Sequence, residues 1–123
     1  MVVFSNLRLG PSAELLVSAQ VAQEMLAATA CAARPMAEAH WEHELVRWLE
    51  ARASAGARTL DVAEIAWTPE HFEIQRRFLI DAIALAARSS AHAAALGRWS
   101  RQIEVHPRDS VQVGRRWQWT VSV

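Results

Sequence analysis

The last seven residues of the chain, 117–123, alternate between apolar and polar side chains. A period of two carried by tryptophan, threonine and valine is typical of a strand with one buried and one solvated face. A single strand leaves its backbone N–H and C=O groups unpaired, so it has to join other strands of the chain or of a second molecule. The sequence therefore predicts that this end of the chain belongs to a sheet.

Two more stretches show the same alternation. Residues 2–9 alternate up to Gly10-Pro11, which favours a first strand followed by a turn. Residues 99–105 alternate as well, and a turn at 106–110 precedes a further strand that begins at Val111. We therefore expect a small, mostly antiparallel sheet formed by the N-terminal strand and a C-terminal hairpin.

Three longer segments place apolar residues at helical spacing. The first is expected to begin at the capping residue Ser12 and to run to about Arg34. The second covers residues 36–54 and ends at Gly56. A third helix is expected to start near Pro69, because Thr68-Pro69-Glu70 combines a capping hydroxyl, a proline and an acid in helix-starting order.

Projection of the third helix places apolar residues on two of its sides. The residues on one side are Phe72, Leu79, Ile80 and Ile83, and those on the other are Ile74, Phe78 and Leu85. The charged residues form a narrow polar wedge that contains Glu73, Arg77, Asp81 and Arg88. A helix with two apolar sides is expected at the centre of a domain.

Residues 57–67 fit either a short strand or a short helix. We favour the helix, because Asp61 followed three residues later by Glu64 resembles a capping box. A brief helical continuation from Ala91 is expected to end near Gly97.

These elements predict a single α+β domain over residues 1–123, with three main helices packed against the sheet. The chain is 52% apolar and 21% charged, which is typical of a folded globular protein and not of a disordered one. Its single cysteine, Cys31, excludes an internal disulfide and fits the reducing cytoplasm. The start of the chain lacks the pattern of a secretory signal, and no apolar run has membrane-spanning length, so we expect no membrane partner.

Charge is unevenly distributed along the chain although its net charge is zero. Residues 1–75 hold five Arg against ten Asp and Glu, and residues 76–123 hold eight Arg against three. Such asymmetry either marks a surface for an acidic partner or lets the two parts attract each other in the folded chain. We favour the internal attraction.

Two histidines and a carboxylate on the second helix have the spacing of metal ligands. His40, His43 and Glu44 lie within one turn of each other. They project opposite the apolar stripe that contains Trp41, however, and Arg47 accompanies them, which is unfavourable for a bound cation. We interpret them as solvated surface residues and expect no metal or other cofactor.

The start of the third helix also carries ionisable residues. Glu70, His71 and Glu73 offer groups for acid–base chemistry or an anion site. The simpler interpretation is that the two acids stabilise the helix start and pair with Arg76 and Arg77 one turn later.

The chain has six tryptophans. Trp41 and Trp48 share a helical face and are predicted to be core, and Trp67 is predicted to pack as a staple for the third helix. Tryptophan and arginine are mixed in the C-terminal region, a composition that is enriched at protein interfaces and on surfaces that stack bases. The predicted partner-binding residues are Arg98, Trp99, Arg101, Arg115, Arg116, Trp117 and Trp119.

Three functional hypotheses follow, beside the structural alternative that the terminal tryptophans only cover the helices. The first is a cytoplasmic, non-enzymatic protein-interaction module of the adaptor, regulator or toxin-neutralising type, which binds a protein partner or self-associates as a homodimer. The second is binding of nucleic acid or an anionic ligand through Arg98, Arg101, Arg115 and Arg116. The third is a metal-dependent enzyme that uses His40, His43 and Glu44, for which we found no catalytic motif.

Overall fold

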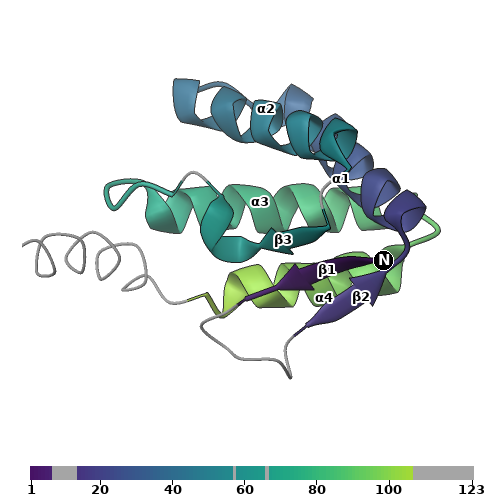
Figure 1. The fold of residues 1–123 in the computed structure, drawn as a ribbon. Helices are drawn as coiled ribbons and strands as arrows, with labels where there is room; N and C mark the ends of the chain where they lie inside the picture. The colour runs from purple at the N-terminus through teal and green to yellow at the C-terminus, as the bar shows by residue number, and fades with distance from the viewer. Residues whose placement is uncertain (7–13, 57, 66, 107–123) are drawn as a thin grey trace, which may run out of the picture.

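The computed structural model describes residues 1–6, 14–56, 58–65 and 67–106. Within these ranges, four α-helices pack against a three-stranded sheet (Figure 1), which confirms the α+β class. The elements are, in chain order, β1 (Val2–Ser5), β2 (Leu15–Val17), α1 (Ala19–Ala33), the 3₁₀ turn η2 (Arg34–Met36), α2 (His40–Ala55), β3 (Thr59–Asp61), the 3₁₀ turn η3 (Val62–Glu64), α3 (Phe72–Ala87) and α4 (Ala93–Glu104).

The sheet has the strand order β2-β1-β3, so the predicted N-terminal strand lies at its centre. β1 pairs with β2 in antiparallel register, with Val3 opposite Leu16, and with β3 in parallel register, with Val3 opposite Thr59. The expectation of a mostly antiparallel sheet is therefore wrong for one of these two pairings. β3 can run parallel to β1 because α1 and α2 lie between β2 and β3 and return the chain to the end of the sheet at which β1 begins. A parallel pair of strands requires such a long connection.

The predicted strand at residues 99–105 is wrong, because residues 99–104 belong to α4. This helix also continues through Gly97, where we expected a helix to end. Leu96, Trp99 and Ile103 are buried and lie three and four residues apart, which is the spacing of one helical face. The alternation that favoured a strand was thus compatible with a helix. The expected strands from Val111 onward and at 117–123 lie outside the described residues.

The first helix begins later than predicted. Residues 15–17 form β2, and the side chain of Ser18 caps α1 by accepting a hydrogen bond from the N–H of Val21 at 3.1 Å. Leu15 and Val17 are buried while Leu16 between them is exposed, so pairing with β1 buries two apolar side chains of this short strand. A helix starting at Ser12 would forgo that pairing.

The second helix ends as predicted. Gly56 has φ 64°, the left-handed conformation that terminates a helix and that glycine adopts without steric cost. After it, both interpretations of the ambiguous segment are realised in succession. β3 ends at Asp61, whose carboxylate accepts a hydrogen bond from the N–H of Ala63 at 2.8 Å and caps the short turn η3.

α3 starts at Phe72, three residues after the predicted start at Pro69. The hydroxyl of Thr68 lies 3.1 Å from Nδ1 of His71, and the side chain of Gln75 accepts a hydrogen bond from the N–H of Thr68 at 3.0 Å. These contacts hold residues 68–71 in a turn before the helix. α3 packs mainly against α1 and α4, and Figure 1 shows it between α4 and the α1–α2 pair, which confirms its central position.

Three of the tryptophans contribute to the core as predicted. Trp41 and Trp48 are partly buried and pack against the core, and Trp67 is buried. The Trp67 ring lies 4.8 Å from that of Phe72, the first residue of α3, so it packs over the start of this helix. Its indole N–H donates to the carbonyl of Val62 at 2.8 Å, which satisfies the only polar group of the side chain.

Candidate interaction surface

The residues predicted to bind a partner are separated by the structure. Arg98 and Arg101 lie exposed on α4, but Trp99 between them is only 2% exposed. Its ring packs edge-on against Phe4 of β1, with centroids 5.3 Å apart. Trp99 is therefore a core residue and cannot serve as a surface anchor. Arg115, Arg116, Trp117 and Trp119 lie outside the described residues.

The proposed metal ligands lie on the solvent side of α2. His40 and His43 are exposed, and Nε2 of His40 is 3.6 Å from a carboxylate oxygen of Glu44. The same carboxylate pairs with Arg47. Within the described ranges, no three His, Cys, Asp or Glu side chains are close enough together to ligate a metal ion. This arrangement fits the interpretation as solvated surface residues.

The ionisable residues at the start of α3 have structural contacts. Glu73 forms an ion pair with Arg76 at 2.6 Å, as predicted for residues one turn apart. The imidazole of His71 stacks on Trp41 of α2, with ring centroids 5.9 Å apart. These contacts connect the helix start to its neighbours.

A buried polar cluster, formed by Asn6, Gln102 and His106, ties β1 to the end of α4. The amide of Asn6 donates to the carbonyl of Gln102 at 3.0 Å, and the amide of Gln102 donates to the carbonyl of Phe4 at 2.9 Å. Asn6 Oδ1 lies 3.3 Å from Nδ1 of His106. All three side chains are buried, so the cluster acts as an internal connection between elements that are distant in sequence. Sequence reasoning missed it.

The side chain of Arg76 caps the C-terminal end of α4. Its guanidinium donates to the carbonyl of Glu104, the last residue of α4, at 3.1 Å and to that of His106, two residues further on, at 3.0 Å. The last carbonyls of a helix have no partner within the helix. Arg76 thereby joins α3 to α4.

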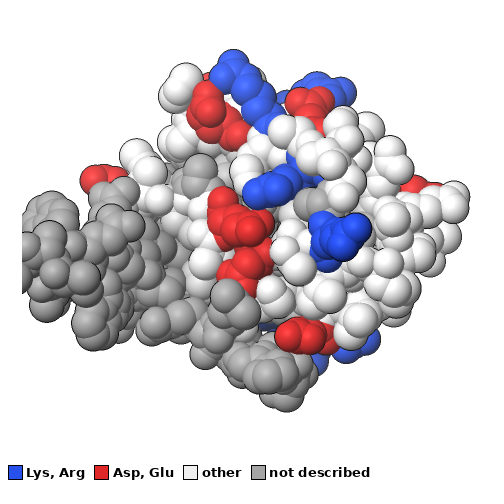
Figure 2. Space-filling model, viewed as in Figure 1, with Lys and Arg blue, Asp and Glu red and all other residues white. Residues whose placement is uncertain are grey.

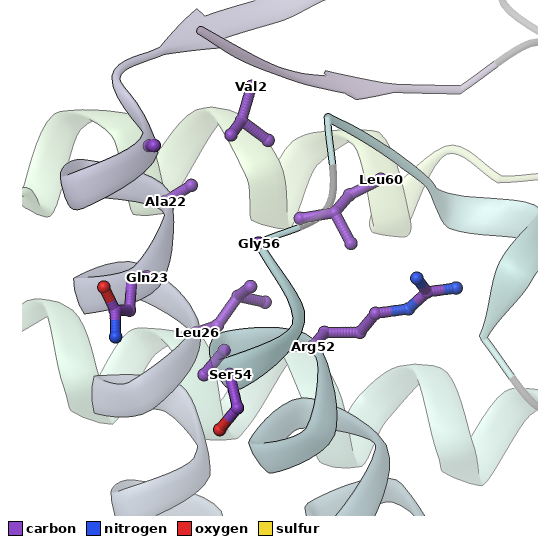
Figure 3. Close-up of a pocket in the computed structure, with 10 residues that line it drawn as sticks. Val2, Ala22, Gln23, Leu26, Arg52, Ser54, Gly56 and Leu60 are labelled. Carbon is purple, nitrogen blue, oxygen red and sulfur yellow. The ribbon is translucent and has the colours of Figure 1, made fainter.

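A small cavity lies among β1, β3, α1 and α2 (Figure 3). Its volume is about 120 Å³, and apolar side chains such as Val2, Leu26 and Leu60 form much of its wall. In Figure 3 the guanidinium of Arg52 extends away from Val2 and Leu26, and it pairs with Glu64 at 3.3 Å. The cavity offers little room for a ligand and we assign it no function.

A larger groove, here called the Cys31 groove, lies between α1 and the α3–α4 connection. Its volume is about 530 Å³ and its lining includes Glu24, Ala28, Cys31, Leu85, Arg88 and His92. His92 Nε2 lies 2.7 Å from a carboxylate oxygen of Glu24, a contact that ties the connection to α1. Hydrogen bonds from His92 and Gln20 hold the pKa of the Glu24 carboxyl below its ordinary value.

The contact between Glu24 and His92 predicts a pH-dependent contribution to stability. A carboxyl whose pKa is lowered in the folded state stabilises the fold above its unfolded pKa, and this contribution is lost as the pH falls through the folded pKa. Glu24→Gln should therefore lower the melting temperature by no more than a few degrees at neutral pH. At about pH 3 the difference between variant and wild type should shrink, and a difference that grows on acidification would contradict this.

One side of α3 is exposed along its whole length. We call it the α3 face and define it by residues three or four positions apart: Ile74, Arg77, Asp81, Leu85 and Arg88. Ile74 is 51% exposed and Leu85 is 41% exposed. The prediction that this side of α3 is buried holds for Phe78, which is 6% exposed, and is wrong for Ile74 and Leu85. The polar wedge predicted from the sequence lies beside them.

Four arginines of α3 and α4 make no ion pair among the described residues: Arg77, Arg88, Arg98 and Arg101. Residues 76–106 contact acidic groups of residues 1–75 through Arg76 with Glu73 and His92 with Glu24. On the face drawn in Figure 2, acidic and basic side chains lie next to each other. Among the described residues, ion pairs between the two parts of the chain thus involve only a part of the basic side chains of α3 and α4, and these four arginines are exposed.

None of the helices in the described ranges combines the length and apolar character needed to cross a bilayer. No protein-family model, curated protein or solved structure matches the chain.

Proposed function

We propose that the protein is a non-enzymatic interaction module that self-associates. The observation that supports this most is the α3 face, where Ile74 and Leu85 are exposed in line with charged residues. A single exposed apolar residue is ordinary on a protein surface. Two of them on one helical stripe with Arg77 and Asp81 between them form a contact surface of mixed apolar and charged character, which is typical of reversible protein interfaces.

A cytoplasmic location is part of the proposal. Cys31 is an exposed free thiol, and the chain contains no second cysteine with which to form an internal disulfide. Exposed thiols of this kind persist in reducing compartments.

For binding of nucleic acid or an anionic ligand, the structure describes only Arg98, Trp99 and Arg101 among the residues on which the hypothesis depends. The hypothesis relied on tryptophans next to arginines, and Trp99 is buried against Phe4. Base stacking needs an accessible aromatic face, which Trp99 does not offer. Arg98 and Arg101 remain exposed and would supply only electrostatic attraction.

Ile74→Asp and Leu85→Asp are expected to abolish self-association. A carboxylate placed in an apolar contact is costly to desolvate, so each variant should remain monomeric where the wild type forms dimers. The apparent mass by light scattering at about 100 µM, a concentration suited to a weak dimer, should rise above the 13.7 kDa of one chain only for the wild type. Because both positions are exposed, thermal stability should change by no more than about 0.5 kcal/mol.

Leu16→Asp is the matched control. Leu16 is 56% exposed and lies on β2, an edge strand of the described sheet, far in sequence from α3. Edge strands are themselves sites of pairing between chains. A wild type that stays monomeric, or a dimer that is lost on Leu16→Asp and kept on Ile74→Asp, would contradict the proposal for the α3 face.

A further inference from the structure

The charges of the α3 face are arranged symmetrically about the middle of the helix. Arg77 and Asp81 lie two residues before and two residues after Leu79, with opposite charge. Ile74 and Leu85 lie five residues before and six residues after it, and both are apolar and exposed. A surface in which the two halves are complementary to each other is what a two-fold symmetric contact requires.

The complementary charge pattern continues beyond Ile74 at one end and Leu85 at the other. Glu70 is exposed in the turn before α3, and Arg88 is exposed at its C-cap, nine residues before and nine residues after Leu79. In an antiparallel pair of identical helices, residues equally distant from the centre on opposite sides meet each other. Each charged position would therefore face a residue of opposite charge.

We propose that the occupant of the α3 face is the α3 face of a second copy, packed antiparallel about a two-fold axis at the level of Leu79. This inference rests on the proposed self-association and specifies its partner and register. Arg77 pairs with Asp81 of the second copy and Asp81 with its Arg77, while Ile74 packs against Leu85 of the second copy. The axis generates each contact twice.

A parallel arrangement of the same two helices is disfavoured. It would place Arg77 beside Arg77 and Asp81 beside Asp81 of the second copy, so like charges would face each other at the centre of the contact. Antiparallel packing removes this repulsion. It also places the positive N-terminal end of each helix dipole beside the negative C-terminal end of the other helix. The order of residues on α3 thus selects one orientation.

The Cys31 groove adjoins the far end of this contact. Leu85 belongs both to the α3 face and to the groove lining, as does Arg88. Antiparallel packing carries the Ile74 end of the second copy to this end of α3, where Ala28 and Ala32 offer further apolar surface. A contact that includes the groove buries more area than one helix pair alone.

The size of the contact sets its expected strength. A helix of 16 residues is about 24 Å long at the usual rise per residue. One helix from each copy buries an area at the low end of specific interfaces, where complexes are transient. We therefore expect a dimer with a dissociation constant on the order of 10 to 100 µM.

Charge reversal at the two central positions tests the register. Arg77→Asp places an acid opposite Asp81 of the second copy, and Asp81→Arg places two arginines opposite each other, in both cases twice per dimer. Each single variant should raise the dissociation constant at least about tenfold in sedimentation equilibrium. The double variant Arg77→Asp/Asp81→Arg restores opposite charges at both contacts, and it should bind to within about threefold of the wild type.

Arg58→Asp is the matched control, because Arg58 is an exposed arginine just before β3 that belongs to no candidate surface and makes no ion pair among the described residues. It should leave the dissociation constant unchanged. If the protein dimerises but the double variant is as weak as the single variants, the antiparallel register is wrong while self-association stands. If the wild type itself stays monomeric to about 1 mM, well above the expected range, both proposals fail.

Discussion

Replacing Trp99 with alanine is expected to lower the free energy of unfolding by about 3 to 5 kcal/mol. The side chain is 2% exposed and packs edge-on against Phe4, so its removal leaves a large cavity between α4 and the sheet. This loss is comparable to a substantial part of the total stability of a domain, which is typically about 5 to 15 kcal/mol. Urea denaturation followed by circular dichroism measures it.

Arg98→Ala provides the comparison, since Arg98 is the exposed neighbour of Trp99 on the same helix. It should change stability by no more than about 0.5 kcal/mol. A Trp99→Ala protein with wild-type stability would show that Trp99 does not pack in the core. Trp99 would then again be a candidate anchor for a partner on the surface.

Asn6→Ala should lower the free energy of unfolding by about 2 to 4 kcal/mol, because it removes one of the three side chains of the buried polar cluster. The substitution deletes a donor to the carbonyl of Gln102 and an acceptor beside His106, both of which stay buried. A buried polar group that loses its partner pays the full cost of desolvation. The effect is measured by urea denaturation at constant pH.

Gln20→Ala is the control for Asn6→Ala. Gln20 also donates an amide hydrogen bond, to Glu24 at 3.2 Å, but on the exposed surface of α1. Water can replace such a hydrogen bond, so the free energy of unfolding should fall by only a few tenths of a kcal/mol. Equal losses for the two variants would contradict the structural role of the cluster.

Local patterns in the sequence were sufficient where one residue or a short run decides the backbone. Gly56 ends α2 because its backbone conformation favours glycine, and the first strand follows the alternation from Val2. Local patterns led to a wrong prediction where the spacing of the apolar residues suits both a strand and a helix. Residues 99–105 fit a strand and a helix equally well, and the packing of Trp99 on Phe4 accompanies the helical outcome.

The candidate surface was predictable only in part. The sequence identified the polar wedge of α3 and placed Ile74 and Leu85 on one side of the helix. It could not show that these two residues are exposed, because exposure depends on where α1 and α4 pack. The buried polar cluster had no local signal, since Asn6 and His106 are separated by 100 positions and meet only in the folded chain.

The most direct test of self-association through α3 is a dilution series followed by ¹H–¹⁵N correlation spectra. Between about 20 µM and about 1 mM, a range that spans the expected dissociation constant, amide signals of the α3 face and the Cys31 groove should shift with concentration. Signals of Arg98, Arg101 and Leu16 should stay in place. Spectra that do not change over this range, or shifts confined to α4 or β2, would contradict the account.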